Sequence, residues 1–149
     1  MSATPTSIEP VLGWRVWHVE PREGCLRSWA QTADWPAGEK LEARCRSRLG
    51  LRWRPKSHGA PNKAHECGIY ACRDRAEAEQ LIRDLDEIAP LANRLPSALG
   101  RVSLWGRVIE NTGGWRAEFA YPYNLELHGG DEQLAAELRR RYAVDVALV

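Results

Sequence analysis

The clearest pattern of apolar and polar positions is a pair of alternating segments joined by a turn. Within RVSLWGRVIE, residues 101–110, apolar residues recur at every second position, as Val102, Leu104 and Val108. A glycine-rich turn at 111–114 follows, and WRAEFAY alternates again over 115–121. The pattern predicts a β-hairpin over residues 101–121.

Three further segments have the composition of strands. Residues 13–20 (GWRVWHVE) mix β-branched and aromatic residues with polar ones, and a turn at 21–24 allows residues 25–30 (CLRSWA) to pair back. CGIYAC at 67–72 and VDVALV at 144–149 are short strand-like runs. Residues 34–41 are predicted to form a loop.

Two segments predict helices. Asp74 and Glu77 are spaced as a capping box, behind which Ala78, Leu81, Leu85 and Ile88 recur at helical spacing before Pro90. A second helix is expected to begin after Asp131 and to end in Arg139, Arg140 and Arg141, whose charges suit the end of a helix dipole.

Together these elements predict an α+β fold with a mostly antiparallel sheet and two helices. A chain of 149 residues is long enough for one domain, which we assign to residues 11–149 after a loose tail at 1–10. Residues 44–64 contain few apolar positions and several helix or strand breakers, so we expect an irregular basic loop there.

The N-terminus has no basic start followed by an apolar run, and no stretch is apolar enough for a membrane helix. We therefore expect a cytoplasmic protein without a membrane partner. In a reducing compartment its four cysteines would bind metal or remain thiols rather than form disulfides.

The residue types that bind zinc are concentrated in the basic loop. Cys45, His58, His65 and Cys67 follow the spacing C-x12-H-x6-H-x-C, which predicts a closed, structural zinc site. If the chain around His65 is extended, His65 and Cys67 share a face and Cys72 points away from Cys67. Unrelated buried thiols and loop histidines are the alternative, since the spacing matches no standard zinc finger. A catalytic zinc with Glu66 as base would need a deaminase-like motif that the chain does not contain.

Charge is distributed unevenly, although the net charge is only +1. Between Glu42 and Glu66 there is no acidic residue, and seven basic residues lie there. The predicted partner-contacting residues are Arg46, Arg48, Arg52, Trp53, Arg54 and Lys56. Cations beside an aromatic side chain can neutralise phosphates and stack a base, so nucleic acid is one possible partner. A solvated loop or a surface for an acidic protein is the other interpretation.

Seven tryptophans are present, several on or beside predicted strands, where core packing and a binding wall are both compatible with them. The motifs of nucleophilic, nucleotide-dependent and metalloprotease catalysis are absent from the sequence.

At CGIYA, RVSLWGRVIE and GWRAEFAYP the chain resembles a family of small proteins of actinobacteria and their phages. The likeness runs from residue 13 through the last helix, and it implies architecture without a substrate or an activity. In that family a C-x-C usually precedes GIYA, where this chain has His65 and Cys67, an exchange of one zinc ligand type for another.

The sequence thus predicts a cytosolic, non-enzymatic binding or adaptor protein with a structural zinc and a protein partner. A nucleic-acid-binding protein and a small metal-dependent enzyme are the alternatives. Its oligomeric state is left open by the sequence.

Overall fold

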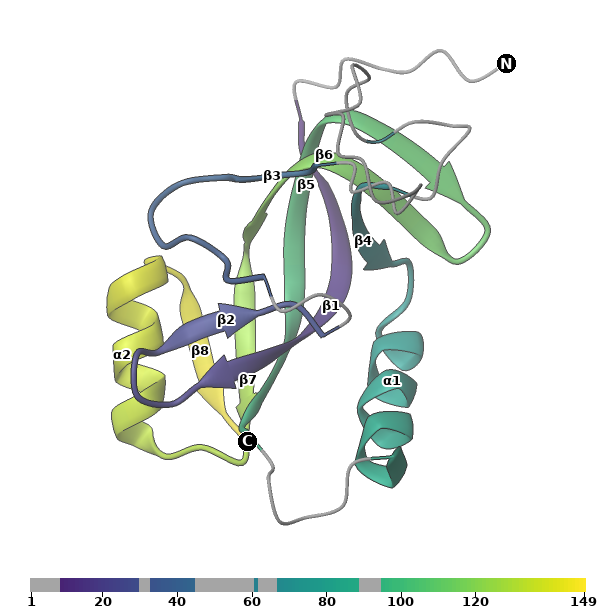
Figure 1. Ribbon diagram of the computed structural model, residues 1–149. Coiled ribbons are helices and arrows are strands. Elements are labelled where there is room, and N and C mark those ends of the chain that lie inside the picture. The colour runs from purple at the N-terminus through teal and green to yellow at the C-terminus, as the bar shows by residue number, and fades with distance from the viewer. Residues whose placement is uncertain (1–8, 30–32, 45–60, 62–66, 89–94) are drawn as a thin grey trace, which may run out of the picture.

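A computed structural model describes residues 9–29, 33–44, 61, 67–88 and 95–149. It confirms the α+β class, with two helices and a mostly antiparallel sheet (Figure 1). The elements in chain order are β1 (Val11–Glu20), β2 (Cys25–Arg27), β3 (Leu41–Glu42), β4 (Ile69–Cys72), α1 (Arg75–Ile88), β5 (Ser97–Asn111), β6 (Gly114–Pro122), β7 (Asn124–His128), α2 (Glu132–Tyr142) and β8 (Asp145–Leu148).

The predicted hairpin is present as β5 and β6, which pair antiparallel around a two-residue turn. Val102 and Leu104 are fully buried, as their alternation predicts. The alternation is interrupted between Trp105 and Val108, where the register shifts at a bulge and Gly106 has a φ of 76°. Ala117 and Ala120, which pair with Val108 and Leu104 on the two sides of that shift, both belong to the core cluster.

The sheet partly closes on itself through β1. This strand pairs with β5 along residues 11–18 and with β2 through the predicted turn at 21–24. On the edge away from β5, β1 also pairs with β4, but only at Trp14 opposite Cys72. Since β4 pairs with β6 and β6 with β5, the four strands form a closed cycle that ends at this single β1–β4 pair.

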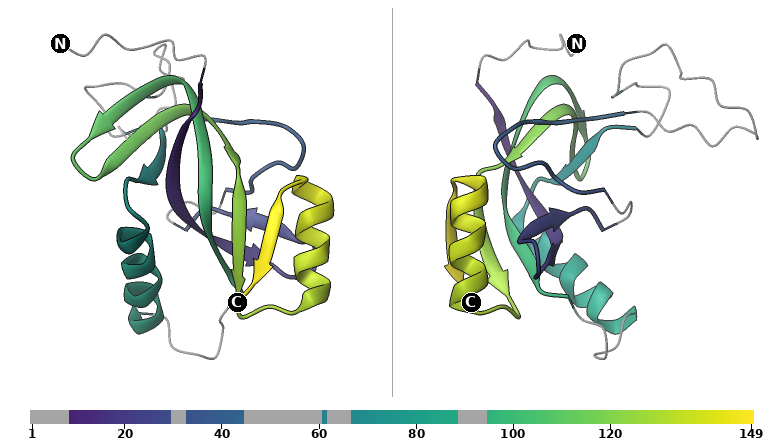
Figure 2. Two further views of the ribbon diagram at one scale, coloured as in Figure 1. Left: turned by 180° about the vertical axis from the view of Figure 1, so that it is seen from behind. Right: turned by 60° about the vertical axis from the view of Figure 1, so that its left-hand side comes forward.

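The two helices lie on opposite flanks of the sheet (Figures 1 and 2). On one flank α2 packs beside β8, which is parallel to β7. The predicted cap is confirmed, because the Asp131 carboxylate accepts from the Leu134 amide at 2.9 Å. On the other flank Ala78 of α1 packs with Val16 and Leu99, whereas Leu81 is 45% exposed despite its helical spacing.

The core is built around tryptophan. Trp17 on β1 is fully buried and meets Trp35, from the connection after β2, edge to face with ring centroids 5.4 Å apart. Leu138 and Tyr142 of α2 complete the same cluster. None of the helices that the structure describes is long and apolar enough to cross a membrane.

Candidate binding groove

A groove of about 1400 Å³ lies between β1, β4 and the β2–β3 connection. Small-molecule pockets typically have volumes of roughly 300–1,000 Å³. The groove is therefore large enough for an extended segment of another chain.

Aromatic side chains form much of its wall. Trp14 and Trp115 approach from β1 and β6, Tyr70 from β4, and Trp29 from the connection after β2. Tyr70 is 45% exposed. Trp29 stacks on His18 with ring centroids 3.4 Å apart. Such rings can cover apolar parts of a ligand while presenting a few polar atoms.

The groove is open because β1 has no strand partner on one edge over part of its length. On this edge β1 pairs with β4 only at Trp14, and its pairing with β2 begins at His18, which leaves residues 15–17 between them. Arg15 lies in this gap and spans it. Its Nη1 donates to the Tyr70 carbonyl on β4, and its Nη2 donates to Ser28 Oγ, after β2, at 3.0 Å.

The guanidinium of Arg15 is held in an apolar setting. It lies 4.9 Å from the centroid of the Trp35 ring. Burial lowers the pKa of Arg15 to about 10, because a low-dielectric environment disfavours its charged form. The residue as a whole is nevertheless only partly buried, since it lines the groove. Among the described residues, no carboxylate forms an ion pair with it.

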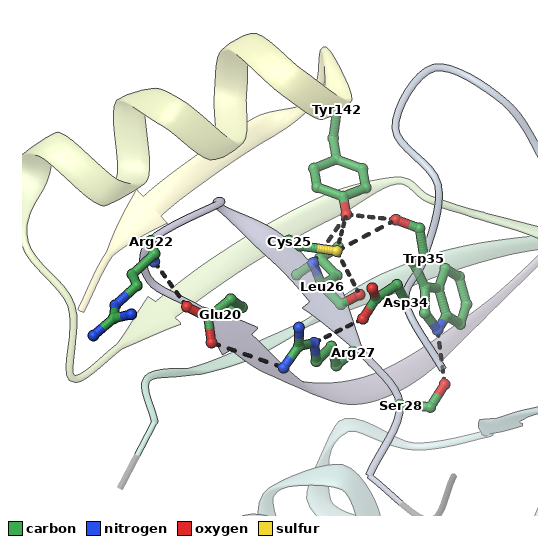
Figure 3. A network of polar contacts seen from close by, with 9 residues as sticks. All are labelled: Glu20, Arg22, Cys25, Leu26, Arg27, Ser28, Asp34, Trp35 and Tyr142. Carbon is green, nitrogen blue, oxygen red and sulfur yellow. Dashed lines mark hydrogen bonds and ion pairs between the residues drawn. The ribbon is translucent and has the colours of Figure 1, made fainter. Parts of the chain in front are cut away.

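The wall carrying Ser28 is fixed by a buried polar network (Figure 3). The Trp35 indole donates to Ser28 Oγ at 2.8 Å, and its backbone amide donates to the Leu26 carbonyl at 2.8 Å. The Tyr142 hydroxyl accepts from the Leu26 amide at 2.9 Å and donates to the Trp35 carbonyl at 2.7 Å. Burial is the main cause of the raised pKa of Tyr142, so the phenol stays neutral. Helix α2 thereby holds the far side of this wall in place.

The predicted zinc site lies mostly outside the described residues. Cys45, His58 and His65 are outside the described residues, and Cys67 is the one predicted ligand that the structure describes. In the part of the chain that the structure describes, no three of the His, Cys, Asp and Glu side chains group as metal ligands. The zinc site therefore remains a prediction.

Cys67 and Cys72 both line the groove. Strand β4 begins only at Ile69, and Gly68 has a φ of 124°, so alternation cannot be counted from Cys67. Burial and then Glu77 raise the pKa of the Cys72 thiol, whereas Arg15 lowers it. Neither cysteine is in a disulfide.

The predicted partner-contacting residues also lie outside the described residues, namely Arg46, Arg48, Arg52, Trp53, Arg54 and Lys56. The described residues on the two sides of 45–66 are Arg44 and Cys67, and both of them line the groove. The basic stretch thus leaves and rejoins the described chain at the groove.

The sequence interpretation missed Arg15 and Ser28. The available signal was a charged residue between Trp14 and Trp17 in a predicted strand. No family model, curated protein or solved structure matches this chain, so the groove itself carries the functional argument.

Proposed function

We propose that this chain is a non-enzymatic binding protein whose groove receives an extended segment of a partner protein. The observation that carries the proposal is the groove of about 1400 Å³, lined by Trp14, Trp29, Tyr70 and Trp115 together with Arg15. Aromatic residues and arginine are the side chains most enriched at the centres of protein interfaces.

The basic stretch adds to this proposal through its position in the chain. Arg44 and Cys67, the described residues that flank it in the sequence, both line the groove. A structural zinc held by Cys45, His58, His65 and Cys67 would fix that stretch, since intracellular Cys/His sets of this kind supply folding energy when metal binds. The zinc is part of the proposal.

The test is a selection of random linear dodecapeptides displayed on phage against the full-length protein, followed by titration of the selected peptides in solution. Tyr70→Ala should weaken binding at least tenfold, because it removes an exposed wall of the groove. Tyr123→Ala is the matched control, since Tyr123 is 52% exposed and does not line the groove. If no peptide is enriched, or if the two variants bind alike, the proposal is wrong.

Nucleic acid is the second candidate, and the acid-free basic run between Glu42 and Glu66 favours it. A phosphate-binding surface predicts affinity for single-stranded DNA or RNA that falls steeply with salt. Fluorescence anisotropy with a labelled 20-nucleotide strand at low salt decides the point, and an absence of binding there removes this candidate.

A further inference from the structure

Side chains that line the groove keep hydrogen-bond donors that no described residue accepts. A guanidinium carries five N–H groups. In Arg15, Nη1 and Nη2 donate to the Tyr70 carbonyl and to Ser28 Oγ. Its Nε is buried and has no acceptor among the described residues. The arginine therefore keeps donor capacity after its contacts in the protein are satisfied.

Ser28 contributes one more donor. Its Oγ accepts from Arg15 Nη2 at 3.0 Å and from Trp35 Nε1 at 2.8 Å. A hydroxyl has two acceptor lone pairs and one hydrogen. Because both lone pairs are occupied, the hydrogen of Ser28 is left to donate, and this residue lines the groove. The buried Nε1 of Trp29, also at the groove, has no acceptor in the described part of the chain.

Among the residues that the structure describes, no carboxylate pairs with the positive charge of Arg15. Asp34 lines the groove but is engaged by Arg27, whose Nε donates to it at 2.7 Å. Glu39 and Glu42 are exposed. Removing a cation from water without an anionic partner is unfavourable, and an anion that arrives with the ligand would offset part of that cost.

From this we infer that Arg15 and Ser28 form a subsite for one side-chain carboxylate, from an Asp or Glu of the segment that occupies the groove. The inference rests on the proposed function. A carboxylate accepts hydrogen bonds without donating any, and its two oxygens match the planar fork of a guanidinium. The Trp35 ring, 4.9 Å from the guanidinium carbon, and the contact with Tyr70 hold that fork in one orientation before the ligand arrives.

The test uses the peptides selected on the wild-type protein, synthesised with acetylated and amidated ends so that only side chains carry carboxylates. We expect every strong binder to contain an Asp or Glu whose replacement by Asn or Gln weakens binding at least tenfold. Arg15→Gln should weaken the parent peptide to the same extent. With that variant, the acidic peptide and its amide counterpart should bind alike, since the two changes remove one interaction.

Two further protein variants separate charge and folding from recognition. Arg107→Gln removes one exposed positive charge outside the groove lining and should leave binding unchanged. Ser28→Ala keeps the charge of Arg15 and should weaken the acidic peptide about threefold to tenfold, with less effect on the amide peptide. Because the peptide substitutions are made against wild-type protein, they decide the question even if Arg15→Gln fails to fold.

The outcomes distinguish the subsite from the groove. If no peptide binds the wild-type protein, the groove function and the subsite both fail. If peptides bind in a Tyr70-dependent way, but Arg15→Gln or loss of the acidic residue changes affinity less than twofold, the groove stands and the carboxylate subsite is overturned. If phosphoserine in place of the acidic residue binds at least tenfold more tightly, the assignment to a carboxylate is overturned in favour of a phosphate.

Discussion

The hydroxyl of Tyr142, at the end of α2, accepts a hydrogen bond from the backbone amide of Leu26 at 2.9 Å. Leu26 lies on β2, which is an end strand of the sheet order. A buried amide on such an edge has no neighbouring strand to accept from it and needs a partner elsewhere. The same hydroxyl donates to the Trp35 carbonyl at 2.7 Å, so one side chain from the C-terminal helix closes the wall of the groove (Figure 3).

Tyr142→Phe should therefore destabilise the fold by about 2–4 kcal/mol, because it leaves a buried amide and a buried carbonyl without their partner. Chemical denaturation followed by tryptophan fluorescence measures the loss. Tyr123→Phe is the matched control, since Tyr123 is 52% exposed, and it should change the free energy of unfolding by less than about 0.5 kcal/mol. Equal effects of the two substitutions would contradict the role of Tyr142.

Gly100 marks the point where β5 exchanges one partner strand for another. Leu99 pairs with β7, whereas Val102 pairs with β6. A Cβ at Gly100 would lie 1.9 Å from the backbone oxygen of Asn124. Gly100→Ala should cost about 3 kcal/mol, because rigid backbone must move to admit the methyl group. Gly113→Ala, whose nearest neighbour would be at 3.7 Å, is the control in the same denaturation experiment and should be tolerated.

Local patterns predicted the elements whose causes are local. The β5–β6 hairpin depends on alternation and on a glycine turn, and α2 depends on the Asp131 cap, all of which can be read in a short window of sequence. Even there, Gly106 produced a bulge that the alternation did not reveal. The α+β class follows from such elements without knowledge of how they meet.

The groove could not be predicted, because it results from pairings between distant segments. It exists because β1 pairs with β5 along residues 11–18 while meeting β4 only at Trp14. Nothing near Arg15 in the sequence indicates that its neighbours in space are Tyr70 and Ser28. The zinc and basic-loop predictions, by contrast, came from residue types and spacing, and of the predicted ligands and contact residues only Cys67 lies in the described part of the chain.

His18 should make stability depend on pH. Burial lowers the pKa of His18 below the usual 6.5, and its Nδ1 has no hydrogen-bond partner among the described residues. Arg27 on β2 is paired with His18 on β1, so the residue opposite His18 carries a positive charge. The folded state therefore binds a proton less readily than the unfolded state. The stabilisation is complete above pH 6.5 and is lost as the pH falls from there toward the folded pKa.

This dependence can be measured from the free energy of unfolding between pH 7.5 and pH 5.0. The wild-type protein should lose stability on acidification, and His18→Gln should reduce that slope. Glu126, whose pKa is lowered mainly by its hydrogen bonds with Arg75, adds a separate loss only as the pH falls below about 4.5. An unchanged slope in His18→Gln between pH 6.5 and 5.0 would exclude His18 as its source.

The predicted zinc site can be tested by elemental mass spectrometry of protein purified without a metal column. We expect about one zinc per chain, because Cys45, His58, His65 and Cys67 provide four ligands of the types that structural zinc prefers. Cys67→Ser and Cys45→Ser should each lower the zinc content markedly. Cys72→Ser is the matched control, since Cys72 also lines the groove but is not one of the four predicted ligands. Metal-free wild-type protein with a full cooperative unfolding transition would refute the zinc prediction, and the groove proposal would then depend on Arg15 and the aromatic wall alone.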